Sequence, residues 1–400
     1  MPASRRSRRL LGTLTVAVLA ITAAPANAAI VPTTSARDVV LIGNALAGTV
    51  SFLDGRTFAN LGSLNVIPDL EQRLSAMTVI ERTGYELVRS QLGDKFVDDM
   101  FLSPDGRTMY VSRANLADVV AIDLVSHQQR WRFKVEGIHA DHMAISPDAR
   151  RIVVSASTGQ QAQVLDAVSG ALVGSFATGS YPHQNDYSND GRRIYNSSIG
   201  VTSMPQLLEP LKGARQVTVV DSTTLRTVRT YTFDHGIRPS VLTPDEKIMY
   251  AQLSYLNGFI EYDMVQGRIL RTVQLPFSPQ GAAMRPDDYP QNSAHHGLAL
   301  SGDRGKLCAA GTIDDYVAII SRPGLTTDRL VPVPRQPYWA VTSVDGRHCV
   351  VSNSGDDSVS VVSYDTAQEV ARVRVGQFPQ RERIAAVAGE VLPTLSPAAG

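Results

Sequence analysis

The chain has 400 residues, and its 38 Lys and Arg are balanced by 38 Asp and Glu, so charge gives no sign of a general polyanionic partner. Hydrophobic residues make up 43% of the chain, which is typical of a folded protein and excludes a disordered one. Four hundred residues exceed one ordinary compact core, but repeat folds escape that limit because they grow by adding units.

The N-terminus has the composition of a secretory signal peptide. A basic segment, MPASRRSRRLLG, leads into the apolar run LLGTLTVAVLAITAA, and the small residues ANA precede Ala29. We therefore expect residues 1–28 to be removed and the mature chain to be secreted or otherwise extracytoplasmic. The paired arginines leave both the Sec and the twin-arginine route open. The apolar run is short for a membrane span, and we expect no span in the mature chain.

The rest of the chain is organised by a repeat, first seen as LSPDGRTMYVS at residues 102–112. In each copy a Ser or Thr marks the same position, and the six marks are Ser103, Ser146, Ser188, Thr243, Ser301 and Ser343. The intervals between them are 43, 42, 55, 58 and 42 residues. A period near 42 residues with two enlarged members is in the range of β-propeller blades.

Each repeat predicts four short strands. One strand enters the S-x-D-G turn, an alternating strand such as TMYVSRA leaves it, and two more follow, as in DVVAIDLVS and EVARVRVGQ. Residues 38–65 supply only three strands, and PQRERIAAV at residues 379–387 supplies the missing innermost one. We therefore expect an all-β, seven-bladed β-propeller over residues 38–387, closed by its C-terminal strand, with a tail over 388–400.

The SPDG turn, the following (M/I)YV(S/T) strand and the later V-x-x-I-D strand resemble those of the exported bacterial YncE-like, YVTN-repeat propellers. The resemblance covers residues 38–387 and implies a seven-bladed propeller. It implies little about activity, because related propellers include binding proteins, lactonases and lyases.

The chain contains two cysteines, Cys308 and Cys349. An exported chain favours a disulfide, but the repeat places both residues at equivalent points in the second strands of adjacent blades. Equivalent side chains point the same way, packed sheets lie roughly 10 Å apart, and a disulfide needs Cα atoms within about 7 Å. We therefore expect two buried free thiols.

The first residues of the innermost strands should surround one mouth of the central channel. Five residues before each marker Ser or Thr lies an outer ring of Asp98, Asp141, His183, Arg238, His296 and Tyr338, with Gln380 as its seventh member. The next position gives an inner ring of Asp99, His142, Gln184, Pro239, Gly297, Trp339 and Arg381. Acidic, imidazole, guanidinium and aromatic groups gathered at one mouth indicate a ligand site.

Carboxylates and neutral imidazoles suit a divalent cation, which is the one cofactor this ring suggests. The predicted metal ligands are Asp98, Asp141, His183 and His296. The predicted catalytic residues are His142, His183 and His296. The predicted substrate-binding residues are Asp99, Arg238, His295, Tyr338, Trp339 and Arg381.

An alternative interpretation is that the Asp and His side chains of the channel only satisfy one another and ordered water. The segment HADH at residues 139–142 fits this alternative, because on a regular strand His139 and His142 would face opposite sides.

Three insertions, at residues 66–96, 200–215 and 279–294, should all rise on the face that carries the mouth, and long loops are often functional. The first has Leu70, Leu74, Met77 and Ile80 at helical spacing behind a Pro-Asp start, which predicts one or two amphipathic helices after blade 1.

Two functions stay open. The first is an exported enzyme that acts on a small molecule at the mouth by hydrolysis, elimination or isomerisation, either metal-assisted or through His and Asp acid–base chemistry. The alternative is a non-catalytic module that binds a glycan, peptide, protein or nucleic acid. In both cases we expect a small-molecule or cell-envelope ligand at the mouth, a monomeric protein and no organic cofactor.

Overall fold

The computed structural model describes Met1 and residues 35–397. The predicted signal peptide, beyond Met1 itself, lies outside the described residues. Within the part that is described, no helix combines the length and the apolar character needed to cross a membrane.

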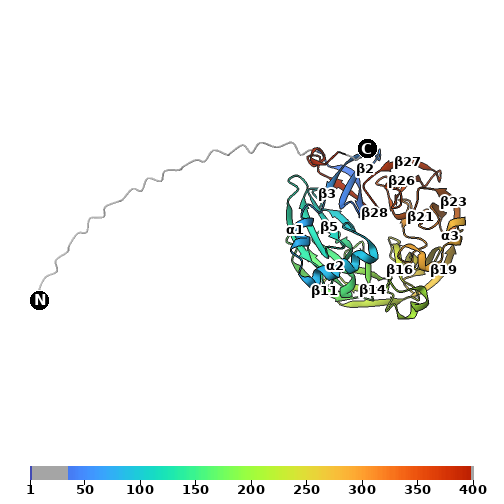
Figure 1. Ribbon diagram of the computed structural model, residues 1–400, viewed down its shortest axis with the longest axis horizontal. Helices are drawn as coiled ribbons and strands as arrows, with labels where there is room; N and C mark the ends of the chain where they lie inside the picture. Colours follow the sequence, from blue (N-terminus) through green and yellow to red (C-terminus); the bar gives the residue numbers. More distant parts are fainter. Residues whose placement is uncertain (2–34, 398–400) are drawn as a thin grey trace. The chain divides into compact units, whose positions relative to one another are not determined.

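Seven four-stranded antiparallel sheets form the ring seen in Figure 1, which confirms the predicted seven-bladed β-propeller. Blade 1 consists of β28 (Pro379–Val387), β1 (Arg37–Asn44), β2 (Thr49–Asp54) and β3 (Asn60–Asn65). Blade 2 consists of β4 (Asp99–Leu102), β5 (Thr108–Arg113), β6 (Asp118–Asp123) and β7 (Gln129–Lys134). Blade 3 consists of β8 (Ala140–Ile145), β9 (Arg151–Ala156), β10 (Gln161–Asp166) and β11 (Leu172–Ala177).

Blades 4 and 5 consist of β12 (Pro182–Tyr187), β13 (Arg193–Ser198), β14 (Gln216–Asp221) and β15 (Thr227–Thr232); and β16 (Ile237–Leu242), β17 (Ile248–Leu253), β18 (Gly258–Asp263) and β19 (Arg268–Gln274). Blades 6 and 7 consist of β20 (Leu298–Leu300), β21 (Lys306–Gly311), β22 (Tyr316–Ser321) and β23 (Thr326–Pro332); and β24 (Pro337–Thr342), β25 (His348–Asn353), β26 (Ser358–Ser363) and β27 (Glu369–Arg374).

The repeated Ser and Asp hold the turn that joins the first two strands of a blade. In blade 2 the Ser103 hydroxyl donates to Asp105 at 2.5 Å and accepts the Thr108 amide at 2.9 Å. The same pair of contacts recurs in blade 7, where the Ser343 hydroxyl contacts Asp345 and the His348 amide. The repeat that organises the sequence is therefore a turn that satisfies its own polar groups.

The ring closes as the sequence predicts, because β28 pairs antiparallel with β1 from Arg37 opposite Val387 to Asn44 opposite Pro379. The chain then continues to a short 3-10 helix, Leu392–Thr394, and Ser396 pairs with Ser63 on β3.

The core lies between neighbouring blades, because each strand alternates its side chains between the two sheets that flank it. On β21, Leu307 packs among residues of blades 5 and 6, whereas the next residue, Cys308, packs among residues of blades 6 and 7.

The expectation of two free thiols is wrong, since Cys308 and Cys349 form a disulfide with Cα atoms 6.3 Å apart. Counted from the marker Ser301 and Ser343, the two cysteines differ by one position: Cys308 is the third residue of β21 and Cys349 the second residue of β25. A shift of one residue turns a side chain to the other face of its sheet. The two sulfurs therefore meet in the interface between blades 6 and 7.

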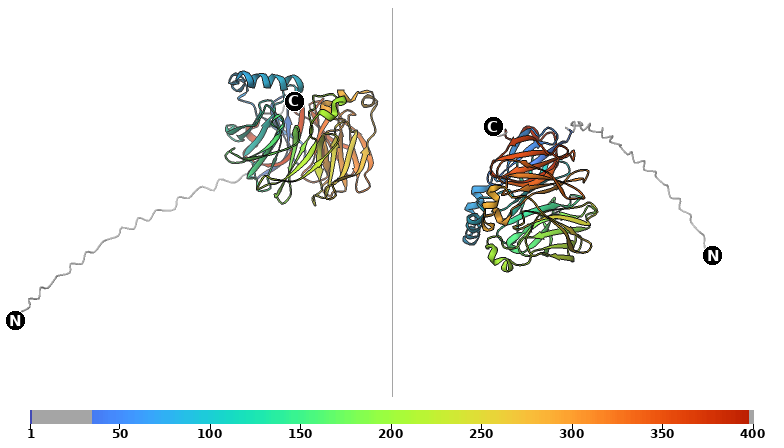
Figure 2. Two further views of the ribbon diagram at one scale, coloured as in Figure 1. Left: turned by 90° about the horizontal axis from the view of Figure 1, so that it is seen from below. Right: turned by 90° about the vertical axis from the view of Figure 1, so that its right-hand side faces the viewer.

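The three insertions gather on one side of the ring, here called the top face (Figure 2). The first contains α1 (Leu70–Ser75) and α2 (Val79–Leu92), separated at Thr78, whose side chain caps α2 in a capping box with Glu81. The second contains the 3-10 helix Gln206–Leu211. The third contains α3 (Pro279–Ala283) and the 3-10 helices Pro286–Asp288 and Pro290–Asn292.

The helical spacing of the first insertion is only partly reflected in its packing. Leu70, Leu74 and Met77 pack against the buried cluster of Tyr85, Phe96 and Leu116, but Ile80 is 82% exposed. The first helix ends at Ser75 and a second begins at Val79, so Ile80 lies in the first turn of a new helix and does not continue the face of the first.

Replacement of Cys308 and Cys349 by Ser should lower the free energy of unfolding by about 2–4 kcal/mol, because the disulfide closes a long loop in the unfolded chain. The measurement is urea unfolding of the native protein and the double variant. Alkylation in denaturant without reductant gives the matching chemical test. Modification of both sulfurs in the untreated protein would contradict the disulfide.

Candidate functional site

A cavity of about 780 Å³, measured out to the solvent at its mouth, opens on the top face. Six of the seven members of the predicted outer ring line it: Asp98, Asp141, His183, His296, Tyr338 and Gln380. Three members of the inner ring also line it: His142, Trp339 and Arg381. The insertions add Val88, Thr202, Ser203 and Gln291 to its wall. Residues from six blades thus converge on one cavity.

The start of the innermost strand is irregular in several blades. The pairing shifts register between Ala140 and Met143, between Pro182 and Asn185, between Ile237 and Ser240, and between Pro337 and Ala340. Such an irregularity re-aims side chains that strict alternation would send to opposite faces. Consecutive residues can therefore both face the cavity, as Asp141 and His142 do.

The irregularity also corrects the expectation for HADH. His139 and His142 both line the cavity instead of facing opposite sides. His139 precedes β8, and the register shift follows it, so the alternation of a regular strand does not apply to this pair.

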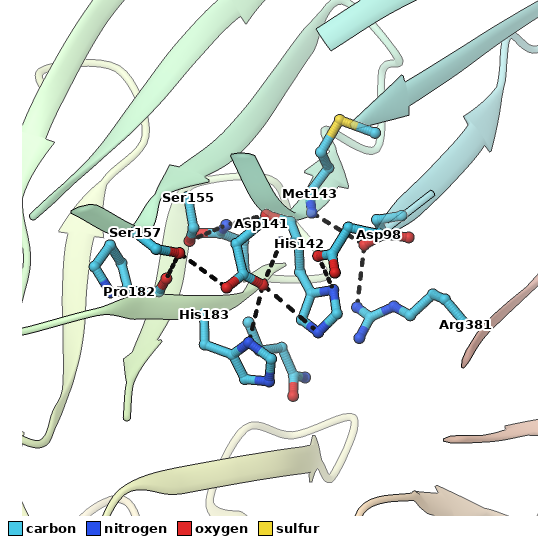
Figure 3. A network of polar contacts seen from close by, with 12 residues as sticks. Asp98, Asp141, His142, Met143, Ser155, Ser157, Pro182, His183 and Arg381 are labelled. Atoms are coloured by element: carbon cyan, nitrogen blue, oxygen red, sulfur yellow. Dashed lines mark hydrogen bonds and ion pairs between the residues drawn. The ribbon is translucent and has the colours of Figure 1, made fainter. Parts of the chain in front are cut away.

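Asp141 is the centre of the polar network in Figure 3. Its Oδ1 lies 2.9 Å from Nδ1 of His183 and 3.8 Å from Nε2 of His142, and its Oδ2 accepts the Ser157 hydroxyl at 2.8 Å. Burial would raise the pKa of Asp141, but the imidazoles of His183 and His142 outweigh it and hold the pKa well below its ordinary value. Asp141 is therefore an ionised carboxylate.

Asp98 occupies the same ring position in the next blade and behaves in the opposite way. Burial, together with the negative charge of Asp141, raises the pKa of Asp98 well above its ordinary value. Its Oδ2 lies 2.9 Å from Nδ1 of His142, although the two atoms are not aligned as a hydrogen bond. The site therefore holds two carboxyl groups whose pKa values are driven apart, an arrangement that provides both an acid and a base.

Three imidazoles offer an unused nitrogen. His142, His183 and His296 are buried, and Nε2 of each has no hydrogen-bond partner. The His142 and His183 ring centroids are 4.2 Å apart, and those of His183 and His296 are 5.7 Å apart. Burial lowers the pKa of both His142 and His296 well below the ordinary value, so these two rings are neutral. Buried polar atoms normally have partners, so these nitrogens point to a ligand.

Asp141, His142 and His183 are grouped closely enough to hold a cation, since one ligand atom from each lies within 4.8 Å of the others. In the part of the chain that is described, they form the one such group of three. It contains two of the four predicted ligands, Asp141 and His183. The third member of the cluster is His142, whereas the other two predicted ligands, Asp98 and His296, are not part of it.

The predicted substrate-binding residues divide into two sets. Tyr338, Trp339 and Arg381 line the cavity. Asp99, Arg238 and His295 are buried outside its lining, and each contacts other protein groups.

The contacts of this second set explain its position. Asp99 accepts two hydrogen bonds from Arg383 deeper in the channel. Arg238 donates to the Gln291 carbonyl and the Ser254 hydroxyl. His295 lies 3.3 Å from the Tyr316 hydroxyl, away from His296.

Sequence reasoning missed several polar groups of the site, among them Lys95, Tyr181 and Ser157. Lys95 and Tyr181 line the cavity, and Ser157 supports Asp141. Lys95 lies just outside the counted ring, three residues before Asp98 at the end of an insertion. Its nearness to Asp98 in the sequence was the one signal that could have placed it at the site. Residues of an insertion have no equivalent in the other blades, so the repeat cannot predict where they lie.

Comparison with known proteins supports the fold alone. No family model and no curated protein matches the chain. Among solved structures, a chain of the hydrazine synthase of Kuenenia stuttgartiensis matches with a TM-score of 0.57 and 20% identity, over 79% of this chain and 89% of that one. The resemblance to YncE-like propellers therefore stays a prediction beyond the shared architecture.

Asp186, near the opposite end of the channel, should make stability depend on pH. Burial raises the pKa of Asp186 from 3.8 to about 6. Between these values the folded state keeps a proton that the unfolded state loses, so stability should fall as pH rises through this window. Asp186→Asn should remove that fall and stabilise the protein above about pH 6 by on the order of 1 kcal/mol, since remaining solvent contact reduces the effect.

The measurement is chemical unfolding of both proteins between about pH 4 and pH 8. Asp54→Asn is a control without a slope in this range, because hydrogen bonds from Thr57 and Arg37 outweigh burial and lower the pKa of Asp54 below 3.8, so its titration lies below the measured pH values. A parallel pH profile for the native protein and Asp186→Asn would contradict the prediction.

Proposed function

We propose that this protein is an enzyme that acts on a small molecule in the top-face cavity, at a divalent cation held by Asp141, His142 and His183. The observation that carries the proposal is the buried cluster of one ionised carboxylate and two imidazoles at the wall of a cavity open to solvent. Imidazole and carboxylate together suit a borderline cation such as Zn²⁺.

The distances within the cluster are compatible with one ion. Two ligand atoms that each lie at most about 2.2 Å from a cation are at most about 4.4 Å apart. Asp141 Oδ1 meets this limit with both imidazoles, at 2.9 Å and 3.8 Å. The widest separation in the cluster, up to 4.8 Å, would have to shorten by a few tenths of an ångström.

The groups around the cluster supply what such a site requires. Asp98 Oδ2 lies 2.9 Å from Nδ1 of His142, so Asp98 would orient this metal-binding imidazole once the two atoms align as a hydrogen bond. His296 presents its free Nε2 beside His183 and is stacked on Tyr338 at 4.0 Å between ring centroids. It is therefore placed to take a proton from the substrate or from water.

The cation would polarise a carbonyl group or activate water. Asp98 would act as a proton donor and His296 as a proton acceptor. The reaction class is then hydrolysis at a carbonyl carbon, or elimination or isomerisation at the carbon next to it. The disulfide between Cys308 and Cys349 supports the predicted export, because such bonds persist in oxidising compartments.

The chelator-treated protein should bind one Zn²⁺ per chain, measured by calorimetry and elemental analysis. His142→Ala with His183→Ala should weaken binding by at least 100-fold, because two of three ligands are removed. His295→Ala is the matched control, since His295 is equally buried but outside the cavity, and it should bind Zn²⁺ normally. His296→Ala should also keep the metal while losing turnover.

Turnover is measured as proton release from ester and lactone substrates, with and without Zn²⁺. Activity that requires the metal and disappears in the double variant would support the enzyme. Unchanged Zn²⁺ binding in the double variant, or none in the native protein, would contradict the proposed centre. Tight binding of small molecules without any turnover would favour the alternative of a binding module.

A further inference from the structure

The wall of the cavity includes Arg381, a buried guanidinium with unused hydrogen-bond donors. Arg381 lies on β28, is 1% exposed, and its guanidinium carbon is 3.5 Å from the centroid of the Trp339 ring. Its Nη2 lies 3.2 Å from Oδ2 of Asp99. Its Nε and Nη1 are buried without a hydrogen-bond partner. Figure 3 shows this side chain close to His142, on the border of the proposed metal cluster.

The negative charge near Arg381 is shared. Asp99 also accepts two hydrogen bonds from Arg383, at 2.9 Å and 2.7 Å, so one carboxylate serves two guanidinium groups. Two donors of Arg381, Nε and Nη1, therefore remain without a partner in a buried place, which is costly unless an acceptor binds there.

Lys95 adds a second cation to the cavity. It is 7% exposed, and its ammonium group lies 5.3 Å from the centroid of the Phe378 ring and has no hydrogen bond or ion pair with the described residues. Burial lowers the pKa of Lys95 to about 8, so most of it is charged at neutral pH. The rest of the wall is largely apolar or aromatic, with Val88, Ile199, Tyr338 and Trp339.

We propose that the ligand of this cavity is a small monocarboxylate with an aromatic or similarly flat apolar body, its carboxylate bound by Arg381 and Lys95 and its body packed against Trp339 and Tyr338. The two unpartnered donors of Arg381 match the oxygens of one carboxylate, and charge-assisted hydrogen bonds from Arg are strong and directional. The apolar wall favours this over inorganic phosphate. The proposal names the substrate class of the site under "Proposed function" and rests on that function only for the choice of cavity.

The test uses the metal-free, chelator-treated full-length protein, so that binding cannot arise from coordination to a cation. Phenylacetate and its neutral analogue phenylacetamide are compared by calorimetry. The native protein should bind phenylacetate at least tenfold more tightly than phenylacetamide. Arg381→Gln should abolish this difference and change the affinity for phenylacetamide less than twofold.

Two further variants keep the test decisive. Arg383→Gln removes a guanidinium from the same Asp99 but from outside the cavity lining, so it should preserve the preference for phenylacetate. Lys95→Met should reduce the preference at least threefold, and it carries the test if Arg381→Gln does not fold, as judged by thermal unfolding.

Equal affinity for the acid and the amide in the native protein would overturn the proposal. The proposal would also be overturned if Arg381→Gln and Arg383→Gln lost the preference for phenylacetate equally, or if phosphate bound as tightly as phenylacetate. A preference for phenylacetate in a protein that binds no Zn²⁺ would support the carboxylate site and reject the metal centre. Normal Zn²⁺ binding without the preference for phenylacetate would support the metal centre and reject the carboxylate site.

Discussion

The pairing of β28 with β1 is the interaction on which the rest of the molecule depends. It joins the last strand of the propeller to the first in one sheet, so that blade 1 has no unpaired inner edge and the ring is closed. The same strand carries Gln380 and Arg381 to the cavity and Arg383 into the channel below. The strand pairing that closes the ring therefore also brings these residues to the site.

Asp99 links that closing strand to its neighbours. It accepts two hydrogen bonds from Arg383 and one from the Met143 amide on β8, and it lies beside Arg381. A fully buried carboxylate is tolerated because it is surrounded by donors and positive charge. This network borders the cavity and holds Arg381 at the wall where we propose that an anion binds.

Equivalent ring positions have become chemically different through their neighbours. Asp98 and Asp141 occupy the same place in adjacent blades, yet the pKa of Asp98 is raised and that of Asp141 is lowered. The difference arises because the imidazoles of His183 and His142 outweigh burial at Asp141, whereas burial and the negative charge of Asp141 act in the same direction at Asp98. A repeating scaffold can thus hold an acid and a base a short distance apart. The proposed metal cluster lies on the side of Asp141, and Arg381 and Trp339 form the side that we propose binds a carboxylate.

Residue spacing alone predicts the seven blades, the closing strand and the ring of residues at the mouth, because a repeated turn fixes how far each strand start lies from its marker Ser or Thr. Which members of the ring meet depends on how the folded chain packs. Irregular pairing at the strand starts turned His142 into the cavity, and packing drew Arg238 and His295 away from it. A one-residue offset between blades joined Cys308 to Cys349. These outcomes depend on side-chain direction and on contacts between distant segments, and neither follows from the spacing of residues within one repeat.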